Sequence, residues 1–180
     1  YSVTTAWVSA LLGTLSTSTG PVSIIESPTQ ILVVDGAKGW VWDLVALTFT
    51  QVIPNADTSV TGSNVAVYRD GFGLVNSLAS NQIYQSNYND LSKYAALPGP
   101  TANNAFVQGN PKNVLTMFDL KEEVFIFKSN ATEVWINQGQ PGFAFAQLQG
   151  VYFPHGIVAP SSVARLGDGV AWLASSDEGV

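Results

Sequence analysis

The single histidine, His155, is the first residue to consider for catalysis, because Ser161 and Ser162 follow it closely in the chain. A histidine and a serine can form a hydrolytic pair when the serine lies on a strained turn with the base behind it. The Gly-x-Ser-x-Gly pattern that builds such a turn in one large class of hydrolases is absent. We therefore expect His155 to be a loop histidine, and we expect no catalytic residues.

Metal binding has equally few candidate ligands. The chain contains no cysteine and one histidine, which excludes a typical zinc site, a cysteine-ligated iron–sulfur cluster and thiol catalysis. Asp35 and Asp168 lie in glycine-rich turns, where carboxylates can bind calcium, but the spacing of an EF-hand loop is missing. Aspartate at such positions usually caps its own turn. We expect turn caps here, and no metal or cofactor.

Two further patterns resemble parts of catalytic or cofactor sites. Glu122 and Glu123 are adjacent carboxylates, but neighbours on a strand point to opposite faces and cannot act together as a glycosidase pair. The Gly-Phe-Gly run at residues 71–73 is only part of a dinucleotide fingerprint, and it lies inside an expected hairpin rather than before a helix. The sequence thus predicts that the protein is not an enzyme.

Aromatic side chains are plentiful, with five Trp, six Tyr and nine Phe. Exposed rings can form platforms for sugars, whereas buried rings fill the space between packed sheets, and we favour the second interpretation. Trp40 and Trp42 share one face of their expected strand, while Trp135 is in opposite phase to Val134 and Ile136. At least one side chain in each of these strands is expected to pack between neighbouring sheets.

The elements that would position these residues are hairpins. Four segments consist of an apolar run, a short polar or glycine-containing turn, and a second apolar run. Asp-Gly between β-branched or aromatic runs is a strong hairpin signal, because the turn needs positive φ at little steric cost. The paired runs are residues 31–34 with 40–44, 65–68 with 72–75, 115–118 with 124–127, and 163–166 with 170–173.

Two of these hairpins continue into a third strand, at residues 82–85 and 132–137, which makes them antiparallel meanders. The repeats begin about 34, 50 and 48 residues apart, near the ~40–50-residue period of propeller blades. Helical signals are weak, with at most one turn at residues 89–94. The predicted fold is all-β, with antiparallel meanders arranged as blades of a β-propeller. A β-sandwich is the alternative.

The two ends of the sequence bear on the domain organisation. The chain begins at Tyr1 rather than Met, and residues 177–180 look like the middle of a turn. We therefore expect residues 1–180 to be a single β-propeller-like region, cut from a longer chain and forming an incomplete segment of a larger propeller.

Composition excludes several classes of protein. Hydrophobic residues make up 46% of the 180 residues and charged residues 11%, so the chain can bury enough surface to exclude disorder. Seven Lys and Arg against thirteen Asp and Glu give a net charge of −6, which disfavours an ordinary nucleic-acid-binding surface. No apolar stretch approaches the roughly 18 residues of a transmembrane helix, and no membrane partner is expected.

Beyond these patterns, the sequence resembles the packaged-DNA-stabilisation proteins of short-tailed bacteriophages, also called tail accessory factors or tail hub proteins. The C-terminal runs that carry the resemblance are Thr132-Glu133-Val134-Trp135, Asn137-x-Gly139, Phe143-x-Phe145, Gln149-Gly150, Gly156, Ala159-Pro160-x-Ser162-Val163-Ala164-x-Leu166 and Val170-x-Trp172-Leu173. The upstream runs are Gly20-Pro21-Val22-Ser23, Val33-Val34-Asp35-Gly36, Trp40-Val41-Trp42-Asp43, and Asp70-Gly71-Phe72 before Asn76. The similarity spans residues 20–180 and departs from the family pattern at residues 155–157 and 87–110.

This resemblance implies a structural virion protein of the phage tail. Such proteins form a ring below the portal, help to close the DNA exit after packaging, and carry further tail parts. The expected partners are the portal protein, other tail proteins, further copies of the chain in a ring, and packaged DNA in passive contact. Assembly is expected in the host cytoplasm, and no catalytic or ligand residue is carried over from the family.

The physical properties of the chain are compatible with that role. Few positive charges would avoid trapping DNA during its exit, because each phosphate–cation contact adds affinity. We expect loops such as residues 95–111 to contact neighbouring subunits or tail parts. Deleting that loop is expected to block assembly and leave the fold intact.

Two other functions remain open. The first is a carbohydrate-binding β-propeller used in host attachment, with exposed aromatic rings as sugar platforms. The second is a propeller hydrolase, suggested only by residues 175–179, which match the start of an Asp-box, the Ser-x-Asp-x-Gly turn of sialidase-type propellers. That turn stabilises a hairpin, so it supports a fold more than an activity.

Overall fold

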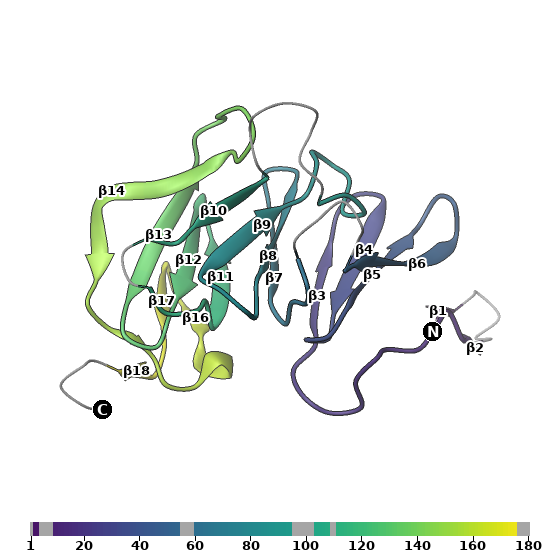
Figure 1. The fold of residues 1–180 in the computed structure, drawn as a ribbon, viewed down its shortest axis with the longest axis horizontal. Helices are drawn as coiled ribbons and strands as arrows, with labels where there is room; N and C mark the ends of the chain where they lie inside the picture. The colour runs from purple at the N-terminus through teal and green to yellow at the C-terminus, as the bar shows by residue number, and fades with distance from the viewer. Residues whose placement is uncertain (1, 4–8, 55–59, 95–102, 109–110, 176–180) are drawn as a thin grey trace.

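The computed structural model describes residues 2–3, 9–54, 60–94, 103–108 and 111–175, and three four-stranded antiparallel sheets dominate it (Figure 1). The first sheet contains β3 (Ser23–Glu26), β4 (Gln30–Val34), β5 (Gly39–Asp43) and β6 (Thr48–Ile53). The second contains β7 (Ala66–Arg69), β8 (Phe72–Asn76), β9 (Gln82–Gln85) and β10 (Asn104–Phe106). The third contains β11 (Thr116–Leu120), β12 (Glu123–Phe127), β13 (Thr132–Asn137) and β14 (Phe145–Phe153).

Smaller two-stranded pairs lie toward the two ends of the chain. One pair joins β1 (Ser2–Val3) to β2 (Ser9–Ala10). Near the C-terminus, β15 (Gly156–Ile157) pairs with β18 (Ala174–Ser175), and β16 (Ala164–Leu166) pairs with β17 (Gly169–Ala171). In the part of the chain that the structure describes, a single 3-10 turn covers Pro160–Ser162. Among the described residues, no helix has the length and apolar character needed to cross a membrane.

The sheets follow one another as blades of a propeller. Within each four-stranded sheet the strands lie in chain order, and the first strand of the second sheet, β7, contacts both β3 and β11. The inner strands therefore gather on one side, while β6, β10 and β14 are the outer strands (Figure 1). This arrangement confirms the predicted all-β propeller and rejects the sandwich alternative.

All four predicted hairpins form, and the turn chemistry explains their registers. Arg69 pairs with Phe72, so Asp70 and Gly71 are the two central residues of the β7–β8 turn. Both have positive φ, 51° for Asp70 and 86° for Gly71, as the Asp-Gly signal requires. The hairpin β16–β17 turns in the same two-residue manner, because Leu166 pairs with Gly169.

The structure corrects the sequence predictions at three places. The strands β3, β6, β10 and β14 complete the sheets but were not predicted. Residues 89–94 form hydrogen-bonded turns instead of a helical turn, with a β-bridge between Asn87 and Asp90. Within the described residues, the fourth blade-like unit is a two-stranded hairpin, β16–β17, and not a full blade. Its Leu166 is 72% exposed and belongs to neither of the two clusters of buried apolar residues that form the core.

The core consists of two apolar clusters, one on each face of the second sheet. The first cluster joins Leu32 and Val41 of the first sheet to Val75 and Tyr84. The second cluster contains the residues of β7, β8 and β9 that point to the opposite face, together with residues of the third sheet. From the second sheet come Val67, Leu74 and Ile83, and from the third come Met117, Val124, Ile126 and Trp135. Because the second sheet is buried on both faces, its strands carry apolar residues in both phases, such as Leu74 and Val75 in β8 and Ile83 and Tyr84 in β9.

Candidate functional site

Within the described residues, the structure does not assemble a hydrolytic site around the histidine. The imidazole of His155 is exposed, and the His155 backbone carbonyl accepts a hydrogen bond of 2.8 Å from Thr132 Oγ1. The Ser162 hydroxyl accepts a hydrogen bond of 3.0 Å from the Leu173 backbone N–H. Ser161 instead lines a cavity beside the inner strands. The interpretation of His155 as a loop residue fits this geometry.

Asp35 caps its own turn and also fixes the segment that precedes the first sheet. Its Oδ1 accepts hydrogen bonds from the backbone N–H of Ala37 (3.1 Å) and Lys38 (2.9 Å). Its Oδ2 accepts from the N–H of Ser16 (2.8 Å) and Thr17 (2.9 Å). Burial alone would raise the pKa of Asp35, but the hydrogen bonds from Lys38, Thr17 and Ser16 outweigh it and lower the pKa.

The Asp35 cap predicts a measurable acid sensitivity. Replacing Asp35 with asparagine should destabilise the fold by on the order of 2 kcal/mol at neutral pH, because charge-assisted hydrogen bonds are lost. The folded-state pKa lies below the unfolded value, so this stabilisation is present above about pH 3.9 and is lost as pH falls through the folded pKa. Urea midpoints measured from about pH 6 down to about pH 2 should therefore fall less steeply in Asp35→Asn.

Asp168→Asn is the matched control for this experiment. The Asp168 side chain is 86% exposed and lies 3.4 Å from Lys121 Nζ, a pair of the kind that contributes little to stability. This variant should keep the acid dependence of the unchanged protein. An identical acid dependence for Asp35→Asn would contradict the proposed role of Asp35.

The remaining sequence patterns also have structural roles. Glu122 lies in the β11–β12 turn, while Glu123 begins β12 and pairs with Leu120 across the hairpin. Residues 71–73 close the β7–β8 hairpin, and the Gly73 N–H donates to Ser86 Oγ at 2.9 Å. The Asp-box match at residues 175–179 lies outside the described residues except for Ser175. In the described part of the chain, no group of three His, Asp or Glu side chains could hold a metal ion.

Most large aromatic rings are packed rather than exposed. Trp135 is 6% exposed and lies in the cluster between the second and third sheets, as the phase of β13 predicts. In β5 the side chain between neighbouring sheets is Val41, which lies in the cluster between the first and second sheets. Trp40 instead stacks on Phe49, with ring centroids 6.3 Å apart. The Trp172 ring packs against the Phe127 ring, with centroids 5.2 Å apart, and so attaches the C-terminal hairpin to the third sheet.

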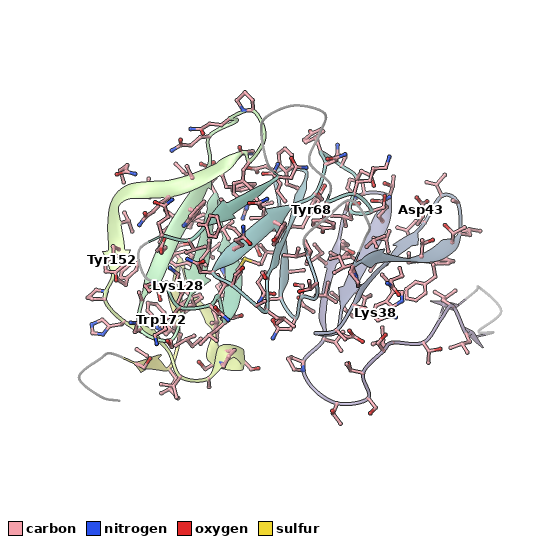
Figure 2. All side chains as sticks on the ribbon, in the orientation of Figure 1. Lys38, Asp43, Tyr68, Lys128, Tyr152 and Trp172 are labelled. Carbon is pink, nitrogen blue, oxygen red and sulfur yellow. The ribbon has the colours of Figure 1, made fainter. Side chains whose placement is uncertain are left out.

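A buried ion pair between the second and third sheets was not predicted from the sequence. Lys128 Nζ donates to Glu133 Oε1 at 2.8 Å and to the Val107 carbonyl at 2.7 Å, and both charged side chains are fully buried. The Trp135 indole N–H donates to Glu133 Oε2 at 3.1 Å. Burial lowers the pKa of Lys128, and the Glu133 carboxylate offsets part of this effect. Figure 2 labels Lys128 and Trp172 beside the third sheet.

A hairpin tip without polar side chains projects from the first sheet. We call residues 44–47, in the β5–β6 turn, the apolar tip; they are Leu, Val, Ala and Leu. Val45 is 77% exposed and Leu47 is 68% exposed. Asp43 Oδ1 accepts hydrogen bonds from the N–H of Val45 (2.9 Å) and Ala46 (2.8 Å), which lower the pKa of Asp43 and fix the turn. Contiguous exposed apolar side chains mark interaction sites, so the apolar tip is a candidate contact surface.

Several hollows lie among the described residues, and two of them lie beside the inner and the outer strands of the blades. A cavity of about 530 Å³ lies where β3, β7 and β11 begin, and no residue that lines it is charged. Its lining comes from residues 21–23, 64–66, 115–117 and 160–161, so it marks the side on which the inner strands gather. A second hollow of about 400 Å³ lies on the outer rim, between β10 and β14. We call this second hollow the rim groove.

A family model and one solved structure agree with this architecture. A family model described as "Bacteriophage P22 Gp10, beta-propeller" matches residues 1–180. No curated protein matches the chain. The crystal structure of the computationally designed Ika4 protein has a TM-score of 0.53 and 11% identity, with 96% of each chain covered. A chain of the mitotic checkpoint complex has a TM-score of 0.47 and 10% identity, covering 83% of this chain and 48% of that chain. At 11% identity, the likeness to Ika4 supports the fold alone.

Proposed function

The chain belongs to the phage stabilisation family of bacteriophage P22 Gp10 β-propellers, and from this membership we propose that it is a tail-hub protein. In the proposed role it binds below the portal as a ring of identical subunits, retains the packaged DNA and carries further tail parts. The family is one of structural tail components and not of enzymes. The match over residues 1–180 is the observation that carries this proposal.

The charges of the protein support passive contact with the packaged DNA. The net charge is −6, with seven Lys and Arg in total. Four of these seven side chains lie beside a carboxylate; they are Arg69, Lys93, Lys121 and Lys128. Because phosphate binding requires cations that are available to the phosphate, this arrangement favours a surface along which DNA can pass.

We also propose that residues 1–180 form one region of a larger propeller. The outer face of the first sheet supports this proposal, since no further four-stranded sheet of the described residues packs against it. Ile24 on this face is 64% exposed and its cross-strand neighbour Val33 is half-buried, whereas Trp40, the next residue in this row, is 7% exposed and stacks on Phe49 of β6.

The apolar tip provides the most direct experiment on assembly. Replacing Val45 and Leu47 together with aspartate should weaken association with the portal and with further copies by roughly 100-fold, because two charges replace apolar contact residues. The fold should persist, since both side chains are exposed and aspartate tolerates the positive φ of 55° at Leu47. Sedimentation of the variant with purified portal rings measures the loss.

Ala79→Asp is the matched control, because Ala79 is an exposed residue in the β8–β9 turn of the neighbouring sheet. This variant should associate like the unchanged protein. Normal assembly of the Val45→Asp/Leu47→Asp variant would remove the apolar tip from the proposed interface.

The expectation that residues 95–111 form a loop dispensable for the fold is wrong for its described part. Residues 104–106 form β10, which pairs with β9, and Val107 is fully buried and accepts the Lys128 hydrogen bond. Deleting the segment would remove this strand and the acceptor. Contact of the segment with neighbouring subunits stays a proposal, and point substitutions are the appropriate test. Residues 95–102 and 109–110 lie outside the described residues.

A further inference from the structure

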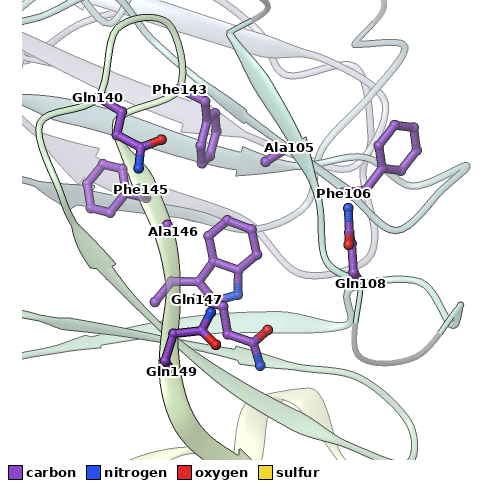
Figure 3. Close-up of a pocket in the computed structure, with 10 residues that line it drawn as sticks. Ala105, Phe106, Gln108, Gln140, Phe143, Phe145, Ala146, Gln147 and Gln149 are labelled. Carbon is purple, nitrogen blue, oxygen red and sulfur yellow. The ribbon is translucent and has the colours of Figure 1, made fainter.

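The rim groove combines aromatic rings with uncharged amide side chains. Phe106 and Gln108 line it from the outer edge of the second sheet (Figure 3). Opposite them, Gln140 and Phe143 lie in the β13–β14 connection, while Gln147 and Gln149 lie on β14. None of the residues lining the groove carries a charge.

This lining selects a class of ligand by its chemistry. Each glutamine amide offers two donors and a two-lone-pair acceptor, which matches neighbouring hydroxyl groups that both donate and accept. The faces of aromatic rings carry partial negative charge and attract the weakly positive C–H groups of a sugar ring. A groove without cations does not favour a phosphate or a carboxylate. The combination favours a neutral carbohydrate.

The groove is preformed rather than dependent on a ligand for its shape. Trp135 lies at its base, and the indole is held by the 3.1 Å hydrogen bond to buried Glu133. The Phe143 ring packs edge-on against the rings of Trp135 and Phe145, with centroid distances of 6.1 Å and 6.3 Å. Fixed rings reduce the entropy that binding costs.

The second sheet also fixes the groove wall. Buried Gln85 donates to the Gly142 carbonyl at 3.1 Å and accepts from the Ala144 N–H at 2.8 Å. These two hydrogen bonds hold the β13–β14 connection against β9. The residues that would contact a ligand thus lie on well-anchored backbone on both sides of the groove.

We propose that the rim groove is a binding site for a short neutral oligosaccharide. Phe106, which is 51% exposed, and half-buried Phe143 form the platforms, and the glutamines bind the hydroxyl groups. The volume of about 400 Å³ lies in the range of small-molecule sites. This binding activity goes beyond a role in DNA retention and adds glycan recognition to a tail component.

The test uses saturation-transfer NMR and calorimetry on the protein. The probes are neutral di- to tetrasaccharides built from glucose, galactose, mannose, rhamnose and N-acetylglucosamine, each at ~10 mM so that a Kd near 1 mM is detected. At least one probe should bind. Gln147→Ala combined with Gln149→Ala should weaken that binding about tenfold, through lost hydrogen bonds. Folding should persist, because Gln149 is exposed, Gln147 is half-buried and neither belongs to a core cluster. Phe106→Ala should also weaken it.

Gln51→Ala is the matched control, because Gln51 is an exposed glutamine on an outer strand of the first sheet, away from the groove. It should bind the probe like the unchanged protein. Failure of every probe to bind would overturn the proposal, as would binding that survives the double substitution. Preferential binding of an extended neutral peptide, such as acetyl-Thr-Val-Thr-Val-Thr-amide, would also overturn it and identify the groove as a strand-docking site.

Discussion

Replacing Lys128 with methionine is expected to lower the free energy of unfolding by about 3–5 kcal/mol, the range for breaking a buried ion pair by removing one partner. Methionine retains most of the side-chain volume, so the loss is electrostatic rather than a cavity effect. The Glu133 carboxylate, fully buried, would lose the ammonium group that lies 2.8 Å away. The Val107 carbonyl would lose its 2.7 Å hydrogen bond from the same group.

A second substitution separates the charge effect from a packing effect. Changing Glu133 to glutamine in the Lys128→Met background removes the buried negative charge and leaves an amide oxygen to accept from the Trp135 indole. The double variant should therefore recover at least half of the lost stability, measured by urea unfolding. A single variant within about 0.5 kcal/mol of the unchanged protein would contradict the importance of this pair.

Gly156→Ala is expected to be the next most destabilising change, by about 3 kcal/mol, because it overpacks a site bounded by backbone. A Cβ atom at Gly156 would lie 2.2 Å from both Asn130 N and Ser129 C. The Gly156 carbonyl accepts a 2.9 Å hydrogen bond from the Trp172 indole, and the neighbouring Ile157 N–H donates to the Lys128 carbonyl at 2.8 Å. The strain would therefore reach the whole junction between the third sheet and the C-terminal hairpin.

Gly169→Ala is the matched control for Gly156→Ala. A Cβ atom at Gly169 would meet its nearest neighbour, the Leu166 carbonyl oxygen, at 3.7 Å, which is ordinary van der Waals contact. This variant should change the urea midpoint little, within about 0.5 kcal/mol in free energy. Equal effects of the two substitutions would refute the steric explanation.

The hairpins of the blades were predictable because their signals are local. The Asp70-Gly71 turn has the residue types that positive φ requires, and apolar runs flank it on both sides. The outer strands were harder to predict, because they are defined by pairing with a neighbour. β10 has only three residues, and β14 contains Gly150 with positive φ and an irregular register opposite β13.

The buried ion pair was also missed, for a physical reason. Lys128 and Glu133 flank the β12–β13 turn, where charged residues ordinarily face solvent, but Lys128 reaches the Val107 carbonyl beyond β10 and both side chains are buried. The apolar tip did carry a readable signal, since Leu-Val-Ala-Leu occupies a turn in which polar residues are usual. The rim groove depends on residues from two sheets, so no local pattern reveals it.

DNA retention tests the central claim, that the protein closes the DNA exit of a phage head, most directly. Filled heads of the source phage would be assembled without the protein, and DNA release would be followed over time, with and without added full-length protein. The proposed function predicts that heads lacking the protein leak their DNA and that adding it back stops the leak. Heads that retain their DNA without the protein, in particles that fail to bind host cells, would contradict the claim and place the protein in host attachment instead.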